Sequence, residues 1–299
     1  MDWLLSPIST GYIEWLEKFV DDWFFVFALA FLAFEFTRYA IYKKLSWALV
    51  GDTITNYITL AFFIGLTILF LGAFYVSTFY YAFQFAVFDI EINWVTVTIC
   101  VVLADLAYYW EHRFMHRVNL AWATHTVHHS SPFFNISVAY RFGPMDSFWP
   151  VFFHVPLVLL GFNPIVVLFA EVVVQLYQTI LHTESIRKLP RPVEWIMNTP
   201  SHHRVHHGSN PKYLDKNYAG IFIVWDRMFG TFEEEREQVV YGLVKPIDST
   251  NPIVAFLHGF YRLAKSAWAM RGFRNKLGVV LGPPGWKPKD KALRSEAAE

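Results

Sequence analysis

The sequence predicts an all-α integral membrane protein with about four transmembrane helices and a cytosolic helical cap that carries dense histidine motifs. Of its 299 residues, 55% are hydrophobic and 17% are charged, whereas soluble domains carry roughly 25% charged residues. Apolar runs close to the roughly 20 residues that a helix needs to cross a bilayer recur along the chain. We predict one membrane-embedded domain at 23–285 with its cap at 182–285, an N-terminal segment at 1–22 and a flexible polar tail at 286–299.

Four apolar stretches define the predicted membrane part. The first three, at 23–42, 57–80 and 94–110, each predict one span. The fourth, at 151–181, is interrupted by Gly161-Phe162-Asn163-Pro164, a cluster that is typical of a turn. We therefore expect a helical hairpin there, which is re-entrant if its two short arms do not cross the bilayer.

The first span contains two charged residues, Glu35 and Arg38. Their spacing of three residues allows the side chains to pair on one face of a helix, and an ion pair inside a membrane can be functional. Arg38 also lies near the end of the span, where a long side chain can extend to the interface. The sequence leaves both interpretations open.

The basic residues predict which side of the membrane holds the histidines. Lys43 and Lys44 follow the first span directly, and no Lys or Arg occurs between residues 45 and 112 or between 142 and 186. Short cytoplasmic loops carry an excess of Lys and Arg, so the loop after the first span is predicted to be cytoplasmic. Counting spans from there, we expect a multi-pass protein whose histidine motifs all lie on the cytoplasmic side.

Charge and cysteine content exclude some kinds of site. The formal net charge is zero, which argues against a nucleic-acid partner, because such proteins usually present a strongly basic face. The single cysteine, Cys100, lies in an apolar run and is interpreted as a buried apolar residue. Residues 252–270 have apolar and aromatic positions, with Arg262 and Lys265 on the polar side, which predicts a helix that either lies on the membrane surface or packs against the cap.

Histidine motifs are the strongest functional signal. Ten of the twelve histidines fall into four short segments. Residues four apart on a helix share a face, so the imidazoles of each motif can reach one centre, and clustered imidazoles need a bound cation because they repel each other once protonated. Nine candidate ligands follow: His112, His116, His125, His128, His129, His182, His203, His206 and His207.

The number of ligands predicts two metal ions. A tetrahedral zinc takes four ligands, so nine are too many for one ion. An all-imidazole shell adds no negative charge, which favours two iron ions and dioxygen chemistry, although the spacing alone does not exclude zinc. No catalytic residue beyond the metal ligands is predicted. Candidates for orienting the rings from a second layer are Asp105, Asn135, Gln178, Glu184, His202, Asp215, Asn217 and Asp226.

These motifs resemble a known family. HRFMH, HTVHHSS and HHRVHH, with DLAYYWEHR before them and WDRMFGTF after them, are similar to the fatty acid hydroxylase/sterol desaturase superfamily over about residues 95–285. The segment from Asn198 to Phe232 resembles the alkylglycerol monooxygenase branch. Two positions depart from the family pattern: Gln178 stands where fatty acid hydroxylases have a histidine, and Arg117 follows the first motif where the ether-lipid enzymes have a glutamate.

The resemblance implies an enzyme, a membrane-bound di-iron monooxygenase that hydroxylates a lipid with dioxygen, with ether lipids as candidate substrates. It also implies iron at the motif histidines and an electron-donor protein or tetrahydrobiopterin as the source of electrons. The apolar, aromatic-rich stretch at 145–181 is expected to line the lipid site. A sterol desaturase or sterol methyl oxidase remains the alternative within the family, and a membrane metal transporter or metal store is the alternative from another class.

Overall fold

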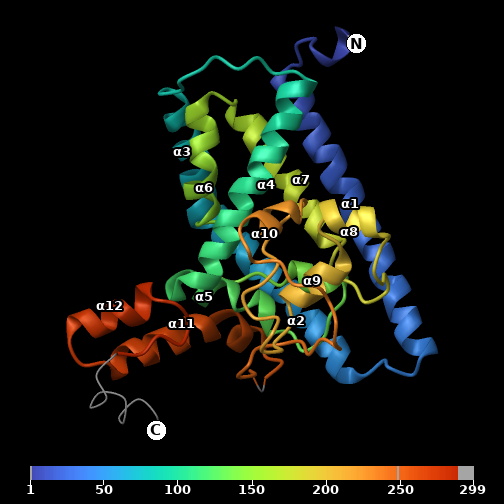
Figure 1. Cartoon of the computed structure of the whole chain (residues 1–299), viewed down its shortest axis with the longest axis vertical. Helices are drawn as coiled ribbons and strands as arrows, with labels where there is room; N and C mark the ends of the chain where they lie inside the picture. Colours follow the sequence, from blue (N-terminus) through green and yellow to red (C-terminus); the bar gives the residue numbers. More distant parts are fainter. Residues whose placement is uncertain (1, 248, 289–299) are drawn as a thin grey trace.

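The computed structural model describes residues 2–247 and 249–288, and within these ranges the chain is helical without a β-strand. The part of the predicted flexible tail from residue 289 onward lies outside the described residues. Figure 1 shows long helices that run side by side, with short helices and loops gathered at one end and an arm of two helices projecting beside them. The all-α prediction is therefore confirmed for the described residues.

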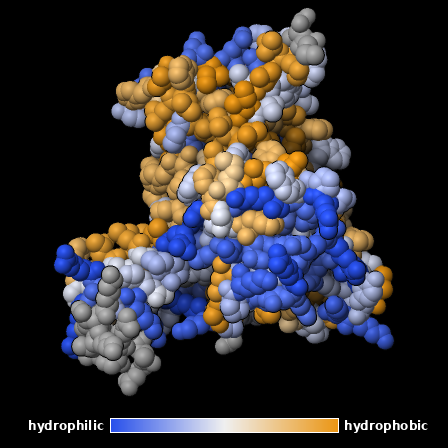
Figure 2. Space-filling model, in the orientation of Figure 1, coloured by the Kyte–Doolittle hydropathy of each residue, from blue (hydrophilic) through white to orange (hydrophobic). Residues whose placement is uncertain are grey.

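Among the residues that the structure describes, three helical stretches are long and apolar enough to cross a membrane. They are α1 (Thr10–Ile41), a continuous stretch at Trp47–Phe83 and α4 (Trp94–Arg117). The second stretch consists of α2 (Trp47–Leu66), a π-helical turn η2 (Thr67–Leu71) and α3 (Gly72–Phe83). Figure 2 shows apolar side chains over the part that these helices form and polar ones over the cap. The chain is thus an integral membrane protein.

The predicted hairpin at 151–181 forms two short helices, α6 (Pro150–Leu160) and α7 (Pro164–Thr179). At 1.5 Å per residue, their 11 and 16 residues reach about 16 and 24 Å, less than the ~30 Å hydrocarbon core. The predicted turn between them is confirmed: Gly161 ends α6 at a φ of +118°, and the Asn163 side chain caps α7. A side chain at Gly161 would collide with the carbonyl oxygen of Phe88.

The first helix starts well before the predicted position of residue 23. Ser9 caps it by accepting a hydrogen bond from the Tyr12 N–H at 3.2 Å, and α1 then runs through the acidic residues Glu14, Glu17 and Asp21. A hydropathy pattern detects only the apolar part of a helix, so it missed this polar extension.

Helix α4 occupies the centre of the bundle, where it packs against α6 and α7 while α1 packs against α7. Small buried side chains at this centre, Cys100, Ala104 and Ala170, allow the helices to approach closely. The interpretation of Cys100 as a buried apolar residue is confirmed. This packing fixes the direction in which the last turns of α4 point toward the cap.

Buried polar contacts fasten the spans to the cap. Arg141 donates hydrogen bonds to Asp52 at 2.9 Å and to Asn56 at 2.7 Å, both on α2. Glu35 on α1 accepts hydrogen bonds from the Ile136 N–H at 2.9 Å and from the Thr183 hydroxyl at 2.6 Å.

Arg38 on the same helix donates a hydrogen bond to the Ser185 hydroxyl at 2.6 Å. Of the two interpretations that the sequence left open, the direct ion pair is not formed, and Glu35 and Arg38 each bond the loop at 183–185.

The cap is built from short elements. Those beneath the spans are α5 (Asn119–His125), η3 (His128–Ser130), η4 (Ile136–Tyr140), α8 (Arg191–Ile196), α9 (Pro200–His206) and α10 (Val224–Met228). The arm in Figure 1 consists of α11 (Pro252–Ala269) and α12 (Phe273–Leu281). The prediction of a helix at 252–270 is confirmed, whereas α12 was not predicted.

Candidate metal centre

All nine predicted ligand histidines meet where α4, α5, α7 and α9 converge. α4 contributes His112 and His116 from its last turns, and His182 follows the end of α7. The second motif spans the end of α5 and the turn η3, and the third lies on α9 and its C-cap. Eight of the nine rings are buried and His128 is partly buried.

The histidines separate into two groups by the positions of their ring nitrogens. Within each group one ring nitrogen of every histidine lies within 4.8 Å of those of the other members. The five-histidine group is His112, His116, His125, His129 and His206, and the four-histidine group is His128, His182, His203 and His207.

Each HxxHH motif contributes to both groups. The pairs that are four residues apart, His125 with His129 and His203 with His207, stay together, because one helical turn brings them side by side. The middle histidine of each motif belongs to the other group: His128 to the four-histidine group and His206 to the five-histidine group. The expectation that all three histidines of a motif serve one face was therefore too simple.

Three backbone carbonyls fix the orientation of the rings. The Nδ1–H groups of His112, His182 and His206 donate hydrogen bonds to the carbonyl oxygens of Tyr218 (2.8 Å), Gln178 (2.9 Å) and Lys216 (3.0 Å). A carbonyl can only accept, so in each neutral ring the proton is on Nδ1 and the Nε2 lone pair is free. All three lone pairs belong to nitrogens that face the inside of the groups.

The inner nitrogens lie unusually close together. His112 Nε2 is 3.0 Å from His125 Nε2, and His182 Nε2 is 2.9 Å from His203 Nε2. In addition, the Nε2 atoms of His116, His206 and His207 are buried without a hydrogen-bond partner among the described residues. Buried polar atoms without partners are rare and require an explanation.

Burial keeps these rings neutral. Desolvation lowers the pKa of His206 to about 4 and that of His182 to about 3. Both rings are therefore unprotonated at pH 7, which is the state that coordinates a metal.

The donor set fits metal ions. Two imidazole nitrogens bound at about 2.0–2.1 Å from one ion are about 2.8–3.4 Å apart for angles between a right angle and the tetrahedral value. The observed separations of 2.9–3.2 Å agree with this range. The two groups also touch, because the rings of His129 and His207 stack with centroids 4.4 Å apart.

Asp105 and Asp226 influence the histidine rings indirectly, through the loop at 218–222. Asp226 accepts hydrogen bonds from the backbone N–H groups of Tyr218 and Ala219, both at 2.8 Å. Asp105 accepts from the N–H groups of Ile221 at 2.5 Å and Phe222 at 2.9 Å. The two carboxylates hold the loop whose Tyr218 carbonyl orients His112, and neither bonds a histidine ring; Asp105 also accepts a hydrogen bond from the Trp225 indole N–H at 2.8 Å.

Two of the other candidates lie next to a ligand histidine. Gln178 orients His182 through its backbone carbonyl, not through its side-chain amide. Asp215 lies 3.8 Å from Nδ1 of His116 and forms a 3.0 Å ion pair with Arg117.

The remaining candidates have partners elsewhere. His202 lies 3.0 Å from Glu194 and outside both groups. Asn217 donates to the carbonyl oxygens of His202 and Glu233. Asn135 caps η4, and Glu184 accepts from Tyr241.

The sequence did not indicate the carbonyls of Tyr218 and Lys216, because a carbonyl belongs to every residue and only the loop conformation aims it. The available signal was the run Asp215-Lys216-Asn217, since Asp and Asn tolerate a positive φ. Asp215 has a φ of +59° and Asn217 a φ of +55°.

A second polar cluster inside the helices was also not predicted. His154 on α6 has Nδ1 3.7 Å from Glu111 and 3.6 Å from Glu171. Tyr75 donates a hydrogen bond to Glu171. Its members come from four helices, and no spacing along the chain connects them.

A cavity of about 700 Å³ opens onto the centre. His116, His129, His206 and His207 form part of its wall, so both groups face it. The rest of its wall comes from α5, α11 and nearby loops, and none of it from 145–181. Most of 145–181 forms α6 and α7 in the bundle, and the expectation that this stretch lines the lipid site stays a prediction.

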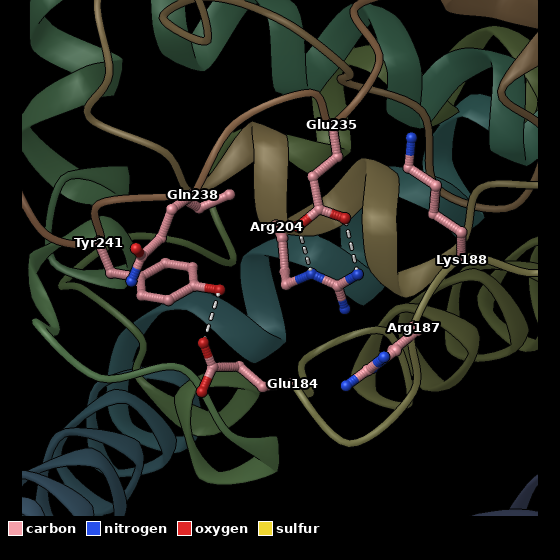
Figure 3. Close-up of a pocket in the computed structure, with 8 residues that line it drawn as sticks. Glu184, Arg187, Lys188, Arg204, Glu235, Gln238 and Tyr241 are labelled. Atoms are coloured by element: carbon pink, nitrogen blue, oxygen red, sulfur yellow. Dashed lines mark hydrogen bonds and ion pairs between the residues drawn. The ribbon is translucent and has the colours of Figure 1, made fainter.

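A smaller, polar cavity of about 470 Å³ lies on the other side of the four-histidine group. Figure 3 shows Arg204 paired with Glu235 and the Tyr241 hydroxyl directed at Glu184. The Tyr241 ring stacks on buried Phe134 with centroids 4.8 Å apart, and Phe134 lies 5.1 Å from His207. Two aromatic rings thus separate this cavity from the four-histidine group.

Comparison with known proteins gives the following relatives. Residues 97–231 match the fatty acid hydroxylase family model. The chain is 47% identical over 185 residues to alkylglycerol monooxygenase of Homo sapiens and 49% identical over 185 residues to that of Danio rerio; both matches cover 62% of this chain and 41% of the relative. Lathosterol oxidase of Mus musculus is 26% identical over 150 residues, which cover 48% of each chain.

The matched region is therefore less than half the length of these relatives. No solved structure matches the chain significantly.

Proposed function

We propose that this chain, whose residues 97–231 match the fatty acid hydroxylase family model, is a membrane-bound, di-iron, dioxygen-dependent lipid hydroxylase. One observation carries this proposal: nine ring nitrogens, eight of them on buried residues, gather around two adjacent centres. The five-histidine group would hold one iron ion and the four-histidine group the other. Imidazole suits iron, and the neutral ligand shell leaves the pair strongly cationic. When bound, the iron pair supplies dioxygen activation.

The protein's own groups orient the ligand rings and keep their inward-facing nitrogens unprotonated. The carbonyls of Tyr218, Gln178 and Lys216 hold three Nδ1 protons away from the centre. Burial keeps the rings neutral, because it disfavours the charged imidazolium. This arrangement needs no amino-acid nucleophile.

The relatives named alkylglycerol monooxygenase support an ether lipid as the substrate. Hydroxylation converts one C–H bond to C–OH and reduces the second oxygen atom to water, so it consumes two electrons and two protons. An electron-donor protein or tetrahydrobiopterin would supply the electrons. Lys43 and Lys44 after α1 support a cytoplasmic position of the histidines.

The lathosterol oxidase relative favours one alternative, a sterol desaturase or sterol methyl oxidase. A desaturase would remove two hydrogens from its lipid, whereas a hydroxylase adds one oxygen. The same histidine groups could serve either outcome, so the product mass distinguishes them. A metal transporter is disfavoured, since the ligands gather at the ends of the helices and not along a path through the bilayer.

The test combines metal analysis with lipid products. Purified protein should contain about two iron ions per chain and consume dioxygen with an alkylglycerol and a reductant. Mass spectrometry should then find a product heavier by one oxygen, or the aldehyde that such a product releases. Iron-loaded protein with all nine histidines intact but without oxygen consumption on ether lipids or sterols would reject the proposal and favour a metal store.

A further inference from the structure

A chain of aromatic rings runs from the five-histidine group to the surface of the molecule. The buried Tyr218 ring lies against two ligand rings, with centroids 5.2 Å from His116 and 5.8 Å from His112. The Tyr109 ring on α4 follows at 6.2 Å from Tyr218, and the Trp110 ring at 5.4 Å from Tyr109. Tyr109 is fully buried, whereas Trp110 is 42% exposed. Rings that can be oxidised by one electron therefore connect the centre with the outside.

The Tyr109 hydroxyl begins a chain of hydrogen bonds that ends at a carboxylate. Its oxygen lies 2.9 Å from the Thr231 hydroxyl oxygen, and that hydroxyl donates to Oδ1 of Asp226 at 2.6 Å. A carboxylate only accepts and a hydroxyl has one proton, so Tyr109 must be the donor to Thr231. Arg113 donates a further hydrogen bond to the Tyr109 oxygen at 2.9 Å. The direction of each hydrogen bond is thereby fixed.

Asp226 is placed to take up the proton of Tyr109. It is fully buried on α10, a helix of the cap. Burial raises the pKa of its carboxyl, which makes it a stronger base than an exposed aspartate. Thr231 can receive one proton from Tyr109 while it passes its own to Asp226, so no other group changes its charge.

The exposed end of the ring chain suits an anionic reductant. The guanidinium of Arg113 lies over the Trp110 ring, 5.5 Å from its centroid. A small anion that donates one electron, such as ascorbate, is attracted by this cation and meets the exposed ring beside it.

We propose that Tyr109 is a redox-active residue that protects the metal centre when no lipid is bound. The proposal rests on the function proposed above, which supplies the oxidant. Tyr109 gives one electron to the oxidised iron pair through the Tyr218 ring. Its O–H bond breaks at the same time, and by way of Thr231 a new O–H bond forms on Asp226. Ascorbate then returns one electron at Trp110, and the proton moves back.

Each such cycle removes one oxidising equivalent from the iron pair, oxidises one ascorbate by one electron and leaves the residues unchanged. The proton acceptor is essential to it, because a tyrosine that loses an electron becomes a strong acid and forms a neutral radical only when its proton can leave. Without the relay, the same oxidising equivalents would attack the imidazole ligands.

Radical spectroscopy tests this proposal without lipid turnover. The iron-loaded full chain in detergent, without lipid, is mixed with hydrogen peroxide and frozen, and electron paramagnetic resonance measures its organic radical. We expect a signal that narrows when the protein carries ring-deuterated tyrosine and that decays faster with ascorbate. Tyr109→Phe should lack the tyrosyl signal, and peptide mass spectrometry should find its ligand histidines gaining one oxygen atom sooner than in the native protein.

Two substitutions of Thr231 test the proton path. Thr231→Ser keeps the hydroxyl and should form the radical at the native rate. Thr231→Val has a similar shape without the hydroxyl and should form it about 100-fold more slowly, the lower end of the effect of a positioned proton acceptor. Unchanged iron content and melting temperature show that both variants are folded.

The matched control is Tyr177→Phe. The Tyr177 hydroxyl donates at 2.6 Å to the backbone carbonyl of Asn198, which does not take up a proton at neutral pH. Its removal should therefore leave the radical unchanged.

Three results would overturn the proposal: a tyrosyl signal of native size in Tyr109→Phe, equal rates in the two Thr231 variants, or a native radical that deuterated tyrosine does not narrow. Lipid hydroxylation without a tyrosyl radical would also overturn it and leave the proposed function standing. A radical at Tyr109 in a protein that oxidises no lipid would overturn the proposed function and leave the relay standing.

Discussion

The five-histidine and four-histidine groups have the same kind of ligand but different surroundings. Three members of the first group, His116, His129 and His206, line the 700 Å³ cavity, whereas His207 is the only member of the second group that does so. The second group is covered on its other side by Phe134, which is 2% exposed. By the number of ligands that line this cavity, we call the five-histidine group the open group and the four-histidine group the closed group; the one partly buried ligand, His128, belongs to the closed group.

This difference suggests different roles for the two groups, although their sequence motifs are alike. An open group can meet a ligand of several atoms, while a group behind packed aromatic rings can exchange only small species or electrons. We therefore expect the open group to contact the substrate and the closed group to complete the pair. The predictions below test this asymmetry, beginning with the largest expected effect.

Removal of one ligand from each group should have the largest effect. His129→Ala in the open group and His182→Ala in the closed group should each lower turnover by at least about 100-fold, because loss of an outer partner alone costs 10–100-fold. Each variant should lose one of the two iron ions, as measured by elemental analysis of the purified protein. Loss of both ions from either variant would show that the groups do not bind independently.

Chelators should distinguish the groups by rate. A chelator added to the iron-loaded protein should remove the ion of the open group first, since the cavity gives access to it. Phe134→Ala should speed removal of the second ion by about tenfold, an effect that corresponds to ~1.4 kcal/mol, because it uncovers His182 and His207. The matched control is Tyr241→Phe, which keeps the stacked ring and should release iron at the original rate.

Much of this site could be predicted from the sequence for a local reason. Residues four apart on a helix share a face whatever the rest of the fold does, so the pair His112 and His116 was recognisable from spacing alone. His182 was harder to recognise, because it belongs to no spaced motif. Only the histidine motifs elsewhere in the chain suggested that it is a ligand. All nine candidates lie in the two groups.

The division into two groups could not be predicted, because it depends on the angle between helices that are distant in sequence. The angle at which α9 packs near α4 and α5 decides which histidine of each motif belongs to which group. The HxxHH spacing does not determine that angle. The same holds for the cluster of Glu111, His154 and Glu171, whose members come from three helices. Spans were predicted from hydropathy, and their ends were less accurate where polar residues continue a helix, as at Thr10.

The carboxylates that hold the loops beside the two groups should differ in how well they tolerate substitution by the amide. Asp105 accepts two backbone N–H groups of the loop beside the open group, and in Asp105→Asn the new amide N–H₂ would face one of them. A backbone N–H group can only donate a hydrogen bond, so one N–H group of the loop would lose its acceptor. We therefore expect the affinity for the ion of the open group to fall by about tenfold. Iron titration of each group measures this.

Glu35 is the corresponding anchor beside the closed group. It accepts from the Thr183 hydroxyl and from the Ile136 N–H, and in Glu35→Gln the hydroxyl can turn to accept instead of donate. The expected loss of iron affinity is therefore smaller, about threefold or less. An equal loss in both anchor variants would mean that the anchors act on the general stability of the bundle and not on the separate groups.

The smallest effect is expected at His202, which adjoins the closed group in sequence but does not belong to it. Its ring faces Glu194 at 3.0 Å, and its backbone carbonyl accepts from Asn217, which remains in any side-chain variant. His202→Ala should therefore keep both iron ions and lower activity only a few-fold, an effect below ~1.4 kcal/mol, through a looser contact between α8 and α9.

His203→Ala, one residue further, should lose the ion of the closed group, so the pair of variants separates proximity from coordination. Glu194→Gln provides the control for His202, since it weakens the same contact without touching a histidine. If His202→Ala released as much iron as His203→Ala, the closed group would extend beyond its four members.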